Sequence, residues 1–168
     1  MIIIKYICLI LIFLTSSKIG FIKSKNLKKR VEELNKIESS FNFFKTKIEY
    51  TNDVIEDIFK QISSIIYNNR ANIFLNTIDK KDNKRLFESW STSLEENLFL
   101  KEDDKELLKI FGKNLGKLDK KGQVFQLDEV ISLIKKQIQN AEEEVKKNEK
   151  MYKSLGTIIG AVIVIILI

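Results

Sequence analysis

Residues 155–168 read Leu155-Gly-Thr-Ile-Ile-Gly-Ala-Val-Ile-Val-Ile-Ile-Leu-Ile168, an apolar run without a charged side chain. At about 1.5 Å per helical residue this run spans roughly 21 Å, which is short of the hydrocarbon core of a bilayer at about 30 Å. Including Met151 and Tyr152, and letting the Lys153 ammonium reach the headgroups, completes a single span. The sequence therefore predicts a C-terminal transmembrane helix over residues 151–168.

The chain upstream of this span has the pattern of a long amphipathic helix. Mostly apolar residues recur in alternating steps of four and three, at Leu127, Ile131, Ile134, Ile138, Ala141, Val145, Asn148 and Tyr152. This spacing places them on one face of a helix, the face that packs in a core. We expect one unbroken helix to link a soluble core to the bilayer.

A second apolar segment lies at the N-terminus and has two interpretations. One is a cleaved signal peptide, with the small residues 15–17 as an imperfect cleavage site. The other is a retained anchor from about Ile2 to Ile22, the first transmembrane helix over residues 1–22. Six basic residues from Lys18 to Arg30 outweigh Lys5 on the other side of the segment. This charge asymmetry favours the retained anchor, with the following chain in the cytoplasm.

The distribution of charge bears on location and on partners. The 168 residues carry a net charge of +6, yet all 23 acidic residues lie within residues 31–150, with 21 of the 29 basic residues, a net of −2. The excess positive charge therefore lies near the apolar ends, where it attracts anionic lipid and marks the cytoplasmic side. We predict a cell-membrane protein with a cytoplasmic domain over residues 24–150, and no nucleic-acid partner.

The residue inventory excludes several kinds of chemistry. The sequence has one cysteine, Cys8, and no histidine, so an intramolecular disulfide and zinc sites built on these residues are excluded. It has no phosphate-binding glycine loop and no dinucleotide fingerprint. Without histidine, a general base near neutral pH would need a tuned carboxylate or lysine. We predict a non-enzyme with no catalytic residue, metal, cofactor or small-molecule substrate.

Two acidic runs, at residues 102–104 and 142–144, could be mistaken for metal sites. Consecutive helical residues point in different directions, so their carboxylates do not converge on one ion. We expect both runs to be solvated surface, the first of them favoured by the dipole at the start of a helix.

Apolar stripes at helical spacing predict an all-α fold of six helices without strands. The expected ranges are about 26–50, 53–67, 69–78, 83–97 and 103–115, followed by the long last helix. Asn52 and Asp53 are expected to cap the second helix, and Asp103 with Glu106 to form a capping box on the fifth. Trp90, the single tryptophan, is expected in the core.

The most distinctive pattern is FGxxLGxxDxxxQ, which runs from Phe111 and Gly112 through Leu115, Gly116 and Asp119 to Gln123. It lies at the predicted turn between the last two helices. Gly116 suits a helix end that needs a left-handed residue, Gly122 flanks the next helix, and Asp119 can cap it. The alternative, compatible with the first, is that Asp119 and Gln123 contact a partner protein.

Gly156 and Gly160 form a small-xxx-small face in the terminal span. They either associate with a second copy or pack against the N-terminal span through Gly20, and we favour the second interpretation.

These features together resemble the stage III sporulation protein AB family of endospore-forming Firmicutes. The resemblance rests on the turn pattern, on residues 151–156 with Gly160 entering the last span, and on Glu88-Ser89-Trp90. It implies a mother-cell membrane component of the channel between mother cell and forespore. The family's cytoplasmic domain is similar to the six-helix platform domain of type II secretion and type IV pilus machines.

The resemblance also implies partners and a mechanism. The partners would be the cytoplasmic ATPase of the complex, protein AA, and other membrane subunits of the channel. The protein would act as a platform that couples the ATPase to those subunits. The alternative is a small oligomerising regulatory protein, or a secretion or pilus platform, unrelated to sporulation.

Overall fold

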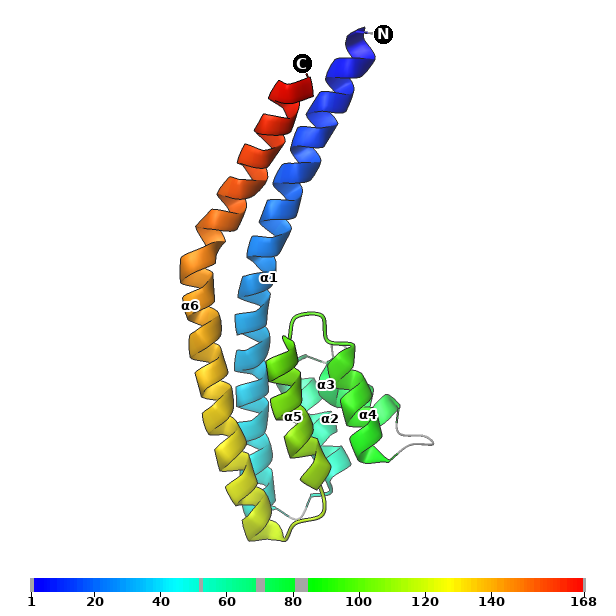
Figure 1. Ribbon diagram of the computed structural model, residues 1–168. Helices are drawn as coiled ribbons and strands as arrows, with labels where there is room; N and C mark the ends of the chain where they lie inside the picture. The colour runs from blue at the N-terminus through cyan, green and yellow to red at the C-terminus, as the bar shows by residue number, and fades with distance from the viewer. Residues whose placement is uncertain (1, 52, 69–71, 81–84, 168) are drawn as a thin grey trace. The chain divides into compact units, whose positions relative to one another are not determined.

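The computed structural model describes residues 2–51, 53–68, 72–80 and 85–167, and within these ranges it contains helices and no strand (Figure 1). The first and last helices are the longest, α1 at Ile2–Tyr50 and α6 at Lys120–Leu167. Between them come α2 at Ile55–Ile65, α3 at Ile73–Asp79, α4 at Leu86–Glu95 and α5 at Glu102–Asn114. The predicted all-α fold of six helices is confirmed. The expected starts at Asn69 and Asn83 lie outside the described residues.

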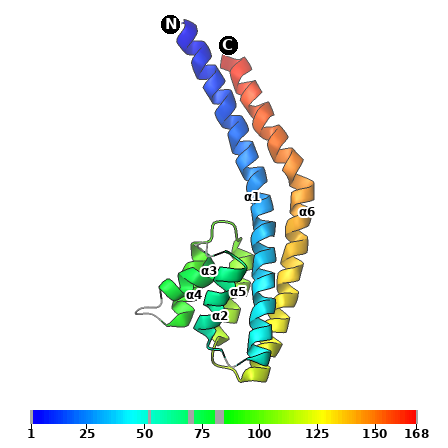
Figure 2. The same cartoon turned by 180° about the vertical axis from the view of Figure 1, so that it is seen from behind.

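The described chain divides into two compact units. One, here called the helical pair, contains the chain up to Val31 together with the residues from Asn140 onward; the other, here called the bundle, is Glu32–Gln139. Both α1 and α6 contribute to both units, because neither helix breaks at the boundary. Viewed from behind, α2 to α5 of the bundle gather on one side of its segments of α1 and α6 (Figure 2).

The bundle is held together by an aromatic core that draws on α1 to α5. Phe41 lies with its ring centroid 4.6 Å from that of Phe111, and Phe59 lies 5.1 Å from Phe74 and 5.7 Å from Trp90. The first two contacts are edge-on, and aromatic contacts of this kind stabilise a core beyond the area they bury. Trp90 is fully buried, as predicted from its helical spacing with apolar neighbours.

Two predicted helix caps are wrong. The residue before α2 is Val54, without a side-chain cap, because the Asp53 carboxylate instead pairs with Lys47 at 3.2 Å; Asn52 lies outside the described residues. Helix α5 begins at Glu102, one residue before the expected cap Asp103. The Asp104 carboxylate reaches back to accept from the Lys101 backbone N–H at 2.9 Å, which satisfies a donor at the helix start.

The helical pair contains the apolar ends of the chain, and α1 and α6 are each long and apolar enough to cross a membrane. Their backbones come close at Gly20 and Gly156: a Cβ placed on Gly20 would lie 2.9 Å from the Gly156 Cα. Ser16 donates its hydroxyl to the Gly156 carbonyl at 2.9 Å. Gly160 faces Phe13 and Ser16. The small residues thus let the two backbones come together.

Candidate functional site: the turn between α5 and α6

Phe111 and Gly112 attach the beginning of the turn to the bundle core. Phe111 is buried, with its ring centroid 6.0 Å from that of Trp90. The Gly112 backbone lies against the indole of Trp90. The indole N–H donates to the Leu108 carbonyl at 2.9 Å. A side chain at Gly112 would collide with the ring, so the glycine allows the indole to lie on the α5 backbone.

Gly116 ends α5 in the left-handed conformation. Its φ is +76°, and it follows Leu115, the residue that closes the helix. The Leu115 N–H donates to the Gly112 carbonyl at 3.3 Å, and the Lys117 N–H donates to the Asn114 carbonyl at 3.0 Å. Only glycine takes this φ without steric cost, so the predicted role of Gly116 is confirmed.

Asp119 and Gln123 fix the other side of the turn. The Asp119 carboxylate accepts from the Gly122 backbone N–H at 3.0 Å and so caps α6, as predicted. The Gln123 side-chain amide donates to the Leu118 carbonyl at 2.7 Å. A Cβ on Gly122 would lie 2.7 Å from the Asp119 carboxylate, so glycine at this position leaves room for the cap. Both polar side chains are therefore engaged in holding the turn itself.

The outward side of the turn is apolar and basic. Leu118 is 38% exposed and Phe125 is 66% exposed. Four exposed lysines surround them, at positions 113, 117, 120 and 121, against the single acidic side chain of Asp119. We call Leu118, Phe125 and these four lysines the turn surface. Its residues are exposed, whereas the Asp119 carboxylate and the Gln123 amide N–H each make a hydrogen bond within the turn; that these two side chains also contact a partner stays a prediction.

Ion pairs attach neighbouring segments to this end of the bundle. Lys45 near the end of α1 pairs with Asp128 in α6 at 2.6 Å, and this contact raises the pKa of Lys45. The ammonium of Lys47 holds the pKa of Asp53 below its usual range. Exposed ion pairs of this kind stabilise a fold only weakly.

The sequence comparison agrees with the turn pattern and the apolar ends. The chain matches the stage III sporulation protein AB family over residues 5–168. The chain belongs to this family. It is also 26% identical over 153 residues to the stage III sporulation protein AB of Bacillus subtilis (strain 168), an alignment that covers 88% of this chain and 90% of that protein. No solved structure matches the chain significantly.

Membership of the stage III sporulation protein AB family confirms the resemblance expected from the sequence. The match includes the turn and both segments that can cross a membrane. The similarity to type II secretion and pilus platforms stays a prediction.

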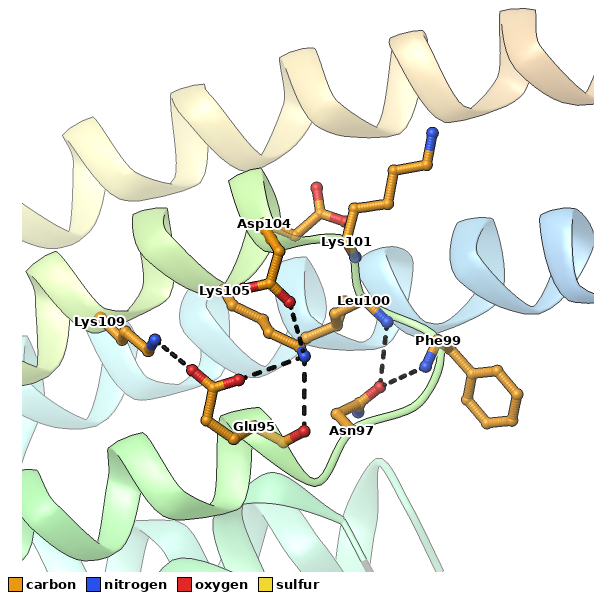
Figure 3. Close-up of polar contacts among 9 residues, drawn as sticks. Glu95, Asn97, Phe99, Leu100, Lys101, Asp104, Lys105 and Lys109 are labelled. Carbon is orange, nitrogen blue, oxygen red and sulfur yellow. Dashed lines mark hydrogen bonds and ion pairs between the residues drawn. The ribbon is translucent and has the colours of Figure 1, made fainter.

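A second polar cluster, between α4 and α5, was not foreseen from the sequence (Figure 3). Lys105 is buried and donates to the Glu102 carboxylate at 3.1 Å and to that of Glu95 at 3.4 Å. The contact with Glu102, and to a smaller extent that with Glu95, raises the pKa of Lys105. Lys109 also pairs with Glu95 and holds the pKa of that carboxyl below its usual range. The cluster ties the start of α5 to the end of α4.

The expectation that both acidic runs are solvated is wrong in part. Asp104 is 1% exposed because it caps α5. Glu144 is half-buried and accepts from Arg30 at 3.1 Å. The remaining members, Asp103, Glu142 and Glu143 among them, are exposed. Among the described residues, no group of three acidic or thiol side chains is placed to hold a metal ion.

Proposed function

We propose that this protein is a non-enzymatic membrane platform of the channel between mother cell and forespore, and that it couples the cytoplasmic ATPase, protein AA, to membrane subunits. The turn surface carries this proposal. It presents exposed apolar side chains on a backbone fixed by Gly116, Asp119 and Gln123. A rigid, exposed apolar patch with charged surroundings is typical of a protein interaction site.

The charge of the turn surface indicates the kind of partner. Four lysines within nine residues face solvent, while the interior of the chain between residues 31 and 150 is slightly acidic overall. A partner with an acidic surface would be attracted here and would approach faster at low salt. We propose that Leu118 and Phe125 then supply the apolar contact and that the ATPase is this partner.

The two long helices support the placement of this platform in a membrane. Each of α1 and α6 contains a segment that is long and apolar enough to cross a membrane, and also a segment of the bundle. The basic residues beside both apolar segments favour a bundle in the mother-cell cytoplasm. A partner bound to the bundle would therefore be held at the membrane.

The alternative, a small regulatory protein that oligomerises through its last span, is less well supported. It requires Gly156 to be open to a second copy, whereas Gly156 lies against Gly20 of the same chain and its carbonyl accepts from Ser16.

Complementation in the source organism tests the proposal. The gene is deleted, and heat-resistant spores are counted after complementation with wild type, with Phe125→Ser combined with Lys121→Glu, or with Ile65→Ser. Ile65 is a matched control, because it is 59% exposed and lies at the C-terminal end of α2, whereas Ile55 at the start of α2 neighbours the turn. We expect the turn variant to lose spores and ATPase recruitment to membranes at unchanged protein level, and the control to behave as wild type.

Two outcomes contradict the proposal. Normal spore counts in the deletion strain would remove the sporulation role and favour a secretion or pilus platform. Normal ATPase recruitment by the turn variant would show that the turn surface is not the docking site.

A further inference from the structure

The bundle contains a second feature with the properties of a binding site, separate from the turn surface. It is a pocket of about 210 Å³ between α1, α3, α4 and the loop after α4. Its lining includes Glu33, Asn72, Ile73, Glu96, Asn97 and Leu98. Small-molecule and cofactor pockets usually measure about 300–1,000 Å³, so this one is sized for a smaller group.

Glu33 places a buried carboxyl group in the pocket. This carboxyl is only 9% exposed, although it is an acidic residue on a helix whose polar face could have reached water. Burial is the main cause that raises its pKa, opposed by a hydrogen bond from Asn97 and by the charge of Lys36. A carboxylate buried in this way is costly unless a cation or several donors compensate its charge.

The pocket is already formed and held open by Asn97. The Asn97 side-chain amide donates to Glu33 at 3.1 Å, while its carbonyl oxygen accepts from the backbone N–H groups of Phe99 at 3.0 Å and Leu100 at 3.2 Å. The loop contacts of Asn97 are visible in Figure 3. On the other wall, Asn72 caps α3 by accepting from the Phe74 and Leu75 N–H groups. Asn72 and Asn97 are therefore both hydrogen-bonded to the adjacent backbone.

The lining offers hydrogen-bond acceptors and negative charge. Glu33 and Glu96 are both acidic, and none of the residues described as lining the pocket is lysine or arginine. Two lysines outside the lining interact with other groups nearby. Lys80 pairs with Glu96, and Lys36 lies over the Tyr67 ring. At the rim, Leu98 is 89% exposed, an unusual position for a leucine on a loop that is otherwise held in place. An acceptor-lined pocket with an apolar rim complements a basic side chain with its alkyl stem.

We propose that this pocket receives a basic side chain of a partner protein, arginine in preference to lysine. The guanidinium would pair with the Glu33 carboxylate inside the pocket, and its stem and the adjoining residues of the partner would cover Leu98. Arginine is favoured because its planar fork can donate two parallel hydrogen bonds to one carboxylate, which the ammonium of lysine cannot do. This site is independent of the turn surface and of the identity of the ATPase.

Methyl NMR on the full chain in nanodiscs tests the site directly. Ile73 and Leu98 line the pocket and report on its occupancy. The probes are N-acetyl-arginine amide and its neutral counterpart N-acetyl-norleucine amide. We expect saturable shifts of both methyl groups with the arginine probe, weaker by about tenfold or more in Glu33→Gln, and none with the norleucine probe. Glu38→Gln, on the same helix outside the pocket, is expected to bind as wild type.

Three outcomes would overturn the proposal. The first is the absence of saturable shifts at Ile73 and Leu98 in the wild type. The second is equal binding of the arginine and norleucine probes, a comparison that needs no variant to fold. The third is tighter binding of the free polyamine spermidine than of the arginine probe, which would indicate a small-molecule site.

Discussion

Gly112 lies so close to Trp90 that a Cβ added to it would sit 2.3 Å from Cδ1 of the indole. No real side chain approaches a ring so closely, so either α5 or the indole would have to move. The indole cannot move freely, because its N–H is bound to the Leu108 carbonyl. The contact fixes the distance between α4 and α5 and hence the place where the turn begins.

Gly112→Ala is therefore expected to destabilise the bundle by about 1–3 kcal/mol, as overpacking of a tight core does. Denaturant unfolding of the detergent-solubilised chain, followed by Trp90 fluorescence, measures this. Lys113→Ala, the next residue on α5, is exposed and is the control, with an expected change within about 0.5 kcal/mol. Equal stability of the two variants would show that the indole tolerates a displacement.

Gly116→Ala is expected to cost about 1–2 kcal/mol, because alanine is strained at the φ of +76° found there. Gly116→Asn should cost less, since asparagine enters the left-handed region more easily. The same unfolding experiment gives both values. If alanine and asparagine behaved alike, the turn would be able to adopt another backbone conformation.

Gly156→Ala is expected to weaken the helical pair more than Gly160→Ala does. A Cβ at Gly156 would lie 2.9 Å from the Gly20 Cα, whereas at Gly160 the nearest atoms are side-chain carbons at 3.2 Å. A backbone atom can move away only if its helix shifts, whereas a side chain can adjust by rotating. Thermal unfolding of each variant in nanodiscs tests the order. A reversed order would contradict the packing of α1 on α6 at Gly20.

Stability should fall in acid partly through Glu149. Lys153, and with it Lys28, holds the pKa of this carboxyl at about 2, below its ordinary value. The stabilisation is present above the ordinary pKa of about 4.3 and is lost as the pH falls from about 5 to about 2. Glu149→Gln should therefore be less stable than wild type at pH 7, with the difference vanishing near pH 2. Glu143→Gln, an exposed neighbour, serves as control; a similar pH profile for both would refute the assignment.

Glu33 should affect the pH dependence of stability in the opposite direction to Glu149. Its pKa is raised by burial, so ionisation of Glu33 costs stability above the ordinary pKa of a glutamate. Glu33→Gln keeps an oxygen for the Asn97 donor and is expected to raise the melting temperature at pH 7 more than at pH 4. A lower melting temperature at pH 7 would mean that the charge itself stabilises the bundle.

The apolar stripes were enough to predict the helices and most of their buried faces. Ile131, Ile134 and Ile138 were assigned to one helical face by their spacing and are buried, because the helical period alone determines which residues share a face. Gly116 and Asp119 were also identified correctly, since their roles depend on local backbone geometry.

The assignments that were wrong or missed depended on a choice among adjacent residues, or on a partner far away in the sequence. Any of the three consecutive acids at residues 102–104 could have capped the start of α5. Only the structure shows that Asp104 is the one that accepts from the Lys101 backbone N–H. The burial of Glu33 could not be inferred, because its partner Asn97 is 64 positions away in the sequence. Lys105 was missed for the same reason: its partner Glu95 lies on a different helix.

The hydrogen bond from Ser16 to Gly156 joins residues 140 positions apart. A contact of such long range can form only after residues 16 to 156 have all been synthesised. Until then, the small-residue face of α1 around Gly20 lacks its partner on α6, and the bundle, Glu32–Gln139, is made between the two. The pairing of the two apolar helices is thus expected to follow the synthesis of the bundle.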